Sequence, residues 1–186
     1  MALRNIVTVD TDRTSVLRKK TRIVEKFDER LKELAADMIE TMHEANGVGL
    51  AAPQVGILRR MFVMNVDPEE GDLVIINPEI IDPEGADVAY EGCLSVPQMY
   101  GQVKRPTRLK LKYQDLQGEV QEIEAEGLKA RCICHETDHI NGIMFTDKII
   151  GELIHESKLI EDEAKRDPKS SEQDLKPDSV EIIEEN

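Results

Sequence analysis

The chain has 186 residues, 40% of them hydrophobic and 33% charged, and its formal net charge is −14 at pH 7. This length and composition are typical of one globular domain and exclude a disordered or fibrous protein. No apolar run approaches the roughly 20 residues of a membrane span, and no apolar segment follows the first basic residues as in a secretory signal. We therefore expect a cytoplasmic protein without a membrane anchor.

The acidic charge also argues against DNA binding, because no basic stripe is present to neutralise phosphates. The one candidate basic patch is better explained as a solvent-exposed strand face; it consists of Lys104, Arg105, Arg108, Lys110 and Lys112.

The first predicted helix begins after Asp28, a favoured N-cap residue, and ends at Asn46 and Gly47. Its apolar residues recur at helical spacing and form one stripe: Leu31, Leu34, Ala35, Met38, Ile39 and Met42. Residues 47–56, with several glycines and a proline, indicate a tightly packed loop or an edge segment.

Short strands are predicted next, at residues 61–66 and 73–76. Residues 109–113 alternate apolar and basic side chains, as a half-exposed strand does. A turn at residues 115–118 leads into an acid-rich returning strand that contains Val120, Ile123 and Ala125.

Two further helices are predicted, at residues 128–140 and 147–165. We expect a single catalytic domain at residues 1–165 and an acidic, mobile tail at residues 166–186. Strands and helices are segregated along the chain rather than alternating. The predicted class is therefore α+β, with mostly antiparallel strands around a central helix, an N-terminal helix and a C-terminal helix.

The central helix carries the sequence His-Glu-Thr-Asp-His at residues 135–139. His135 and His139 lie four residues apart, so both imidazoles face the same side of the helix and can bind one metal ion. Glu136 lies beside them, where it can accept a proton from an attacking water and pass it to a leaving amine. This pattern predicts a metal-dependent amide hydrolase.

A catalytic metal site of this kind needs a third protein ligand and one open position. An extended protease motif would place a histidine where this chain has Phe145. A zinc metalloprotease with a downstream ligand, Glu156 or Glu161, is the alternative function. Cys93 is another candidate, because it lies in a segment rich in Gly and Pro that indicates a loop. Cys132, three residues before His135 on the same helix face, is a rival thiol, although a small buried group in the pocket wall is the preferred role for it.

Three segments, in this order, resemble the signature motifs of the peptide deformylases: residues 47–54 (GVGLAAPQ), 91–95 (EGCLS) and 135–139 (HETDH). The resemblance extends over about residues 1–160 and is to the compact bacterial form of the family. It implies removal of the formyl group from the N-terminal formyl-methionine of new proteins, with release of formate. The implied partners are N-formyl-methionyl nascent peptides, with transient association with the ribosome.

The resemblance also implies roles for individual residues. It assigns the metal to Cys93, His135 and His139 and the general acid/base role to Glu136. The side-chain amide of Gln54 and the backbone N–H of Leu94 would bind the developing oxyanion. The implied metal is Fe²⁺, with Zn²⁺, Ni²⁺ or Co²⁺ able to substitute, whereas ligand softness alone would suit zinc.

The resemblance further implies that the substrate contacts five residues: Val48, Gly49, Gly92, Leu128 and Cys132. Two positions depart from the family pattern, because Arg131 replaces an apolar residue and Cys134 replaces a glutamine. Either the Arg131 stem packs while its charged head leaves the pocket, or the pocket differs.

Overall fold

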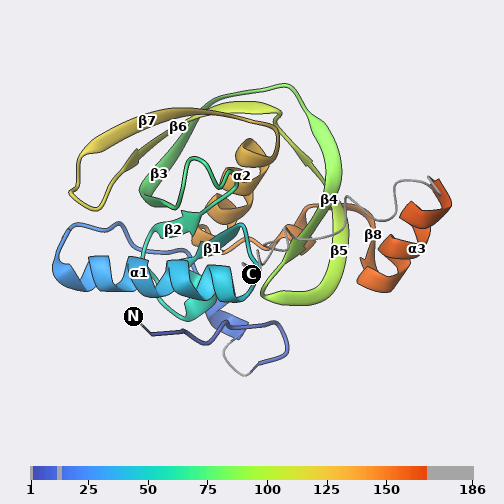
Figure 1. Ribbon diagram of the computed structural model, residues 1–186, viewed down its shortest axis with the longest axis horizontal. Helices are drawn as coiled ribbons and strands as arrows, with labels where there is room; N and C mark the ends of the chain where they lie inside the picture. The colour runs from blue at the N-terminus through green and yellow to red at the C-terminus, as the bar shows by residue number, and fades with distance from the viewer. Residues whose placement is uncertain (1, 12–13, 167–186) are drawn as a thin grey trace, which may run out of the picture.

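Two antiparallel sheets enclose one central helix in the computed structural model, which describes residues 2–11 and 14–166 (Figure 1). The larger sheet has the strand order β1-β2-β3-β6-β7, and the smaller has the order β4-β5-β8. The strands are β1 (Gly49–Ala51), β2 (Met61–Met64), β3 (Leu73–Glu84), β4 (Asp87–Cys93), β5 (Val96–Arg105), β6 (Arg108–Gln114), β7 (Val120–Glu126) and β8 (Ile149–His155). The helices are α1 (Glu29–Glu44), α2 (Gly127–Ile140) and α3 (Glu156–Arg166), with short 3-10 turns at Thr14–Arg18, Ala52–Val55 and Phe145–Asp147. The predicted α+β class is confirmed.

Helix α1 begins where it was predicted and ends at Glu44, just before the predicted Asn46. Its start is fixed by Asp28, whose side chain accepts a hydrogen bond from the Leu31 N–H. Its apolar stripe packs on one face of the larger sheet. On strand β2, Met61 and Val63 face this helix, whereas Phe62 and Met64 face the opposite side. Both faces of β2 are therefore buried, which explains its continuous apolar sequence.

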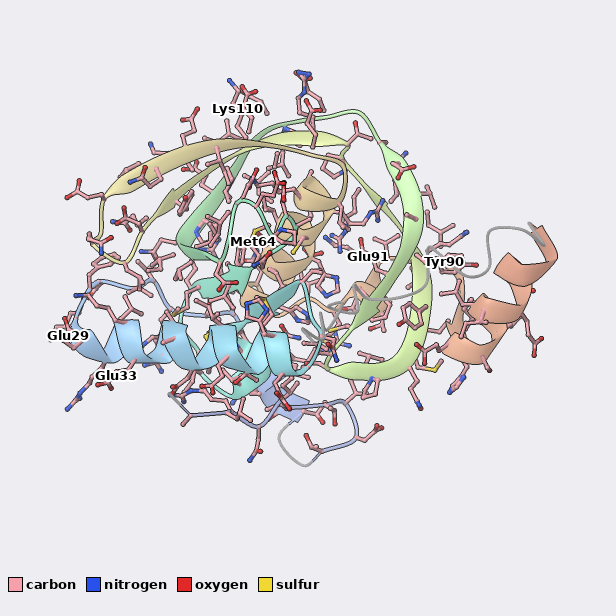
Figure 2. All side chains as sticks on the ribbon, viewed as in Figure 1. Glu29, Glu33, Met64, Tyr90, Glu91 and Lys110 are labelled. Atoms are coloured by element: carbon pink, nitrogen blue, oxygen red, sulfur yellow. The ribbon has the colours of Figure 1, made fainter. Side chains whose placement is uncertain are left out.

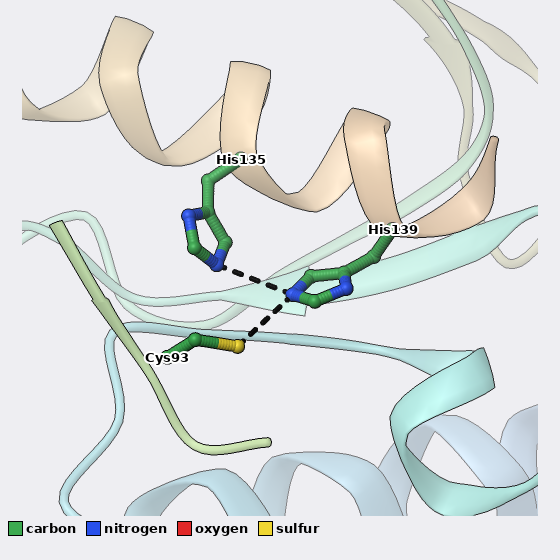
Figure 3. Close-up of side chains that lie close together, drawn as sticks. All are labelled: Cys93, His135 and His139. Atoms are coloured by element: carbon green, nitrogen blue, oxygen red, sulfur yellow. Dashed lines mark hydrogen bonds between the residues drawn. The ribbon is translucent and has the colours of Figure 1, made fainter. Parts of the chain in front are cut away.

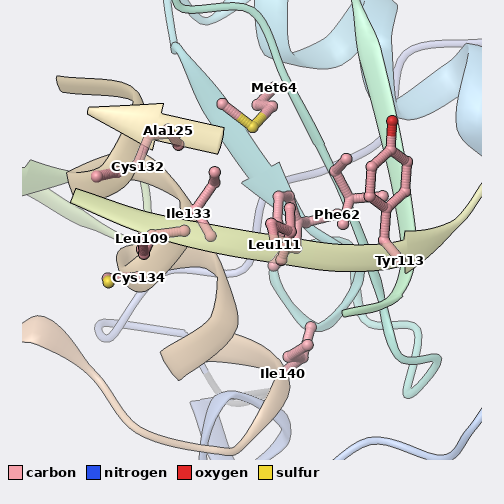
Figure 4. Packing of buried hydrophobic residues seen from close by; sticks show 13 residues of the cluster. Phe62, Met64, Leu109, Leu111, Tyr113, Ala125, Cys132, Ile133, Cys134 and Ile140 are labelled. Atoms are coloured by element: carbon pink, nitrogen blue, oxygen red, sulfur yellow. The ribbon is translucent and has the colours of Figure 1, made fainter. Parts of the chain in front are cut away.

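The opposite face of the larger sheet packs against α2 (Figure 4). One buried cluster joins Ile133 of α2 with side chains of strands β6 and β7, namely Leu109, Leu111 and Ala125. This core packs α2 along the sheet. Figure 1 shows α2 in the middle of the molecule, with the β4–β5 hairpin on its other side and α3 projecting beyond β8.

Three sequence predictions of secondary structure were wrong. Strand β3 runs on past Ile76 to Glu84, with a register shift after Ile76. The segment around Cys93 was predicted as a loop, but it belongs to the β4–β5 hairpin. The predicted helix at residues 147–165 is strand β8 followed by α3, because residues of β8 pair with β5.

The tail predicted at residues 166–186 lies outside the described residues from residue 167 onward. Within the described residues, no helix has the length and apolar character required to cross a membrane.

Candidate active site

Helix α2 presents both histidines of the HETDH segment on one face, as the four-residue spacing requires. The Nε2 atoms of His135 and His139 are 3.2 Å apart, and His139 Nε2 is 3.2 Å from the Sγ of Cys93 (Figure 3). One sulfur and two imidazole nitrogens therefore converge from two separate elements of the fold.

Cys93 is the last residue of β4, opposite Val96 in the β4–β5 hairpin. In the described part of the chain, Cys93, His135 and His139 form the one group of three metal-binding side chains, with ligand atoms within 4.8 Å of one another. Neither Glu156 nor Glu161 belongs to this group, so the geometry gives no support to a metalloprotease with a downstream Glu ligand. A soft thiolate with two imidazoles suits a divalent transition metal and leaves a position open.

Glu91, which sequence reasoning passed over as a functional residue, orients His135. Its Oε2 lies 3.0 Å from His135 Nδ1. Figure 2 shows the Glu91 side chain between β4 and α2. With Nδ1 donating to the carboxylate, the lone pair of Nε2 faces Cys93 and His139, the tautomer that a metal ligand needs. Burial opposes ionisation of Glu91, but hydrogen bonds from Arg105 and His135 outweigh it and hold its pKa well below the usual value.

Arg105 connects Glu91 to Asp138 of α2. Its Nε and Nη2 donate to the two Glu91 oxygens at 2.8 and 2.9 Å, and its Nη1 donates to Asp138 Oδ2 at 2.5 Å. Lys148 donates to the other Asp138 oxygen. Arg105 is only 4% exposed, so its prediction as part of a solvated basic face was wrong. Arg105 lies two residues after the apolar Val103 on β5, so both side chains face the same side of the strand. This alternation is the signal that could have predicted the burial of Arg105.

Arg131 also points into the protein, which answers the alternatives left open by its sequence position. Its charged head does not leave the pocket. Its Nη1 donates to Glu91 Oε1 at 2.8 Å and to the Val103 carbonyl at 2.9 Å. Two arginines therefore share one buried carboxylate.

Glu136 is buried beside the converging ligand atoms, and its Oε2 has no hydrogen-bond partner within the described residues. Burial raises its pKa to about 7. The carboxylate packs against Gly49 of β1, where a Cβ would lie 2.5 Å from Glu136 Oε1 and 2.9 Å from Cys132 Sγ. Glycine at position 49 therefore leaves the space that Glu136 occupies.

Gln54 is 1% exposed and its amide is oriented by its neighbours. Its Oε1 accepts from the Ala51 N–H at 2.8 Å, so its NH₂ group faces Ser95 Oγ at 3.2 Å and Cys93 Sγ at 3.6 Å. An N–H donor thus points toward the cysteine. Leu94 follows Cys93 directly, in the turn between β4 and β5.

One cavity of about 450 Å³ lies beside the site, and its lining includes Gln54, Glu91, Cys93, Arg131, His135 and Glu136. All five residues expected to contact the substrate lie on its wall: Val48, Gly49, Gly92, Leu128 and Cys132. Val48 and Leu128 are 47% and 57% exposed. Burial raises the pKa of Cys132 well above that of a free thiol and that of Cys134 to about 11, so both remain neutral thiols.

Residues 3–153 match the family model described as polypeptide deformylase. The chain is 53% identical to a relative from Caldicellulosiruptor bescii and 56% identical to one from Clostridium botulinum, both named peptide deformylase. These alignments cover 81% and 80% of this chain and 87% and 97% of the relatives. A solved structure of peptide deformylase from Thermotoga maritima superimposes with a TM-score of 0.77 at 45% identity, over 81% of this chain and all of that one.

Proposed function

The chain belongs to the polypeptide deformylase family, and we propose that Cys93, His135 and His139 hold the metal on which this family depends. The protein is an enzyme that hydrolyses the formyl group from the N-terminal formyl-methionine of new proteins and releases formate. Its substrates are therefore formyl-methionyl peptides. The observation that carries the proposed site is the convergence of one sulfur and two imidazole nitrogens beside the Glu136 carboxyl group.

We propose Fe²⁺ as the working metal, with Zn²⁺, Ni²⁺ or Co²⁺ able to substitute. Thiolate and imidazole ligands are compatible with each of these ions, and the family resemblance favours iron. When bound, the cation supplies Lewis acidity that polarises the formyl oxygen and lowers the pKa of water.

Glu136 is the proposed general acid/base. It accepts a proton from the attacking water and later delivers it to the methionine nitrogen, so that formate and a free amine leave. A carboxyl group with a pKa near 7 can perform both transfers at neutral pH. The close packing of Oε1 on Gly49 restricts the position of the group, and Oε2, which has no partner among the described residues, is available to the water.

Gln54 and Leu94 are proposed to stabilise the oxyanion that forms on the formyl oxygen. The Ala51 N–H fixes the Gln54 oxygen, so the amide NH₂ is available as a preorganised donor. The Leu94 backbone N–H follows the Cys93 ligand along the chain and provides the second donor.

The methionine side chain is proposed to enter the cavity bordered by Val48, Leu128 and Cys132, with Gly49 and Gly92 leaving space for the peptide backbone. An apolar wall of this kind suits an unbranched thioether side chain. Because the substrates are nascent chains, we place the enzyme in the cytoplasm, in transient association with the ribosome.

The metal assignment is tested by reconstituting the metal-free protein anaerobically with Fe²⁺, Ni²⁺, Co²⁺ or Zn²⁺ and measuring formate release from a formyl-methionyl peptide. We expect one ion per chain and the highest rate with Fe²⁺. Equal rates with and without metal would contradict the proposed site, and a clear maximum with Zn²⁺ would contradict the choice of iron.

A further inference from the structure

Arg131 occupies a position on α2 one helical turn before His135, and it is 9% exposed. A buried arginine at the wall of a cavity for an apolar side chain needs a reason, because its charge is costly to desolvate. Its guanidinium is held by two backbone carbonyls, Val103 on β5 at 2.9 Å and Asp87 on β4 at 3.2 Å. These contacts fix the guanidinium to the smaller sheet independently of Glu91.

The hydrogen bonds of Glu91 show what Arg131 adds. A carboxylate offers about four lone-pair positions. Arg105 and Arg131 occupy those of Oε1, each at 2.8 Å, and Arg105 and His135 occupy those of Oε2. With all four positions filled, Glu91 has one orientation, and that orientation places its bond to His135.

Arg131 also adds a buried positive charge to this cluster, in which Lys148 pairs with Asp138 from a less buried position. Arg105 is shared between two carboxylates, Glu91 and Asp138. Arg131 supplies the second buried positive charge at Glu91 Oε1. Without Arg131, the only guanidinium at Glu91 would be that of Arg105, which also pairs with Asp138.

We propose that Arg131 is a positioning residue for the metal site, acting through Glu91 on the orientation of His135. It thereby raises the affinity of the site for a divalent cation. This inference rests on the proposed role of His135 as a ligand. Because Arg131 also lines the substrate cavity, its truncation changes substrate binding as well, so the test must measure the metal rather than activity.

The experiment measures the dissociation constant for Co²⁺, by competition with a chelator, in the full-length protein. The variants are Arg131→Met, Glu91→Gln and the double variant, with Lys129→Met as the matched control. Lys129 is a cation on the same helix and pairs with Glu70, away from Glu91. We expect Arg131→Met to weaken Co²⁺ binding about tenfold, as the loss of a group behind a metal ligand typically does, and Lys129→Met to leave it unchanged.

The double variant separates a positioning role from a merely structural one. If Arg131 acts through Glu91, Arg131→Met changes the Co²⁺ affinity by less than about twofold once Glu91 is already Gln. An equal weakening in both backgrounds, or no weakening in the wild-type background, overturns the proposal. If Arg131→Met does not fold, Arg131→Lys enters the same cycle, because one ammonium cannot replace a guanidinium that donates to Glu91 and two carbonyls.

Failure of the underlying metal site has a different signature. Cys93→Ala should abolish specific Co²⁺ binding and the thiolate-to-cobalt absorption band. If that variant kept both, the proposed ligand set would be wrong, and with it the inference about Arg131. Loss of binding in Cys93→Ala together with unchanged binding in Arg131→Met would overturn the inference alone.

Discussion

Gly49→Ala should impair catalysis without removing the metal, because position 49 is where the backbone of β1 meets the Glu136 carboxylate. A Cβ there would lie 2.5 Å from Glu136 Oε1, whereas real contacts of this kind essentially never fall below 3.0 Å. The carboxylate must therefore move by at least about 0.5 Å, and Cys132 Sγ at 2.9 Å restricts the direction of that movement.

The size of the effect follows from the role of Glu136. General acid–base catalysis contributes about 10²- to 10⁴-fold, and a misplacement of about 1 Å can cost about 10²-fold. We expect kcat for formate release to fall about 10- to 100-fold, below the full loss of the carboxylate, since the group is displaced rather than deleted. KM should change less, although Gly49 also lines the cavity.

The assay is steady-state formate release by Fe²⁺-loaded protein, with metal content measured on the same sample. Gly71→Ala is the matched control. Position 71 has φ +74° and open space around its Cβ position, so the substitution strains the backbone without touching Glu136. A Gly49→Ala enzyme with unchanged kcat, or one that loses activity only in proportion to its metal, would refute the reasoning.

Three further predictions concern the ligands, the oxyanion donor and the core. Cys93→Ala should lose the stoichiometric metal ion, as measured by elemental analysis after dialysis; a variant that retained one ion per chain would exclude the cysteine as a ligand. Gln54→Leu should keep its metal and lower kcat about 10²- to 10³-fold, the usual cost of removing one oxyanion donor, and a change confined to KM would argue against that role. Leu109→Ala, which truncates a fully buried side chain between β6 and α2, should reduce the free energy of unfolding by about 2–5 kcal/mol in urea titration. A loss below about 1 kcal/mol would show that this part of the core can relax around the cavity.

Local patterns were sufficient to predict the two longest helices. Asp28 caps α1 through a contact only three residues away, and the apolar stripe of α1 repeats at helical spacing. The HETDH segment likewise brings His135 and His139 together by spacing alone. The third ligand needed the family resemblance, because the fold, not the local sequence, brings Cys93 of β4 to α2.

Features that depend on distant partners were not predicted. Strand β8 is mostly apolar with one acidic residue, Glu152, a composition that a helix can also have, and its pairing with β5 decides the outcome. Arg105 was placed on a solvated face because its neighbours in the sequence are basic. Its burial depends on Glu91 and Asp138, which lie 14 and 33 residues away along the chain.

The most direct test of the central claim is Glu136→Gln, assayed for both metal content and formate release. The wild-type enzyme should release one formate for each free amine formed, and the variant should retain one metal ion per chain while losing at least about 10²-fold in kcat. Full activity in the metal-loaded variant, or the absence of formate release by the wild-type enzyme, would contradict the account.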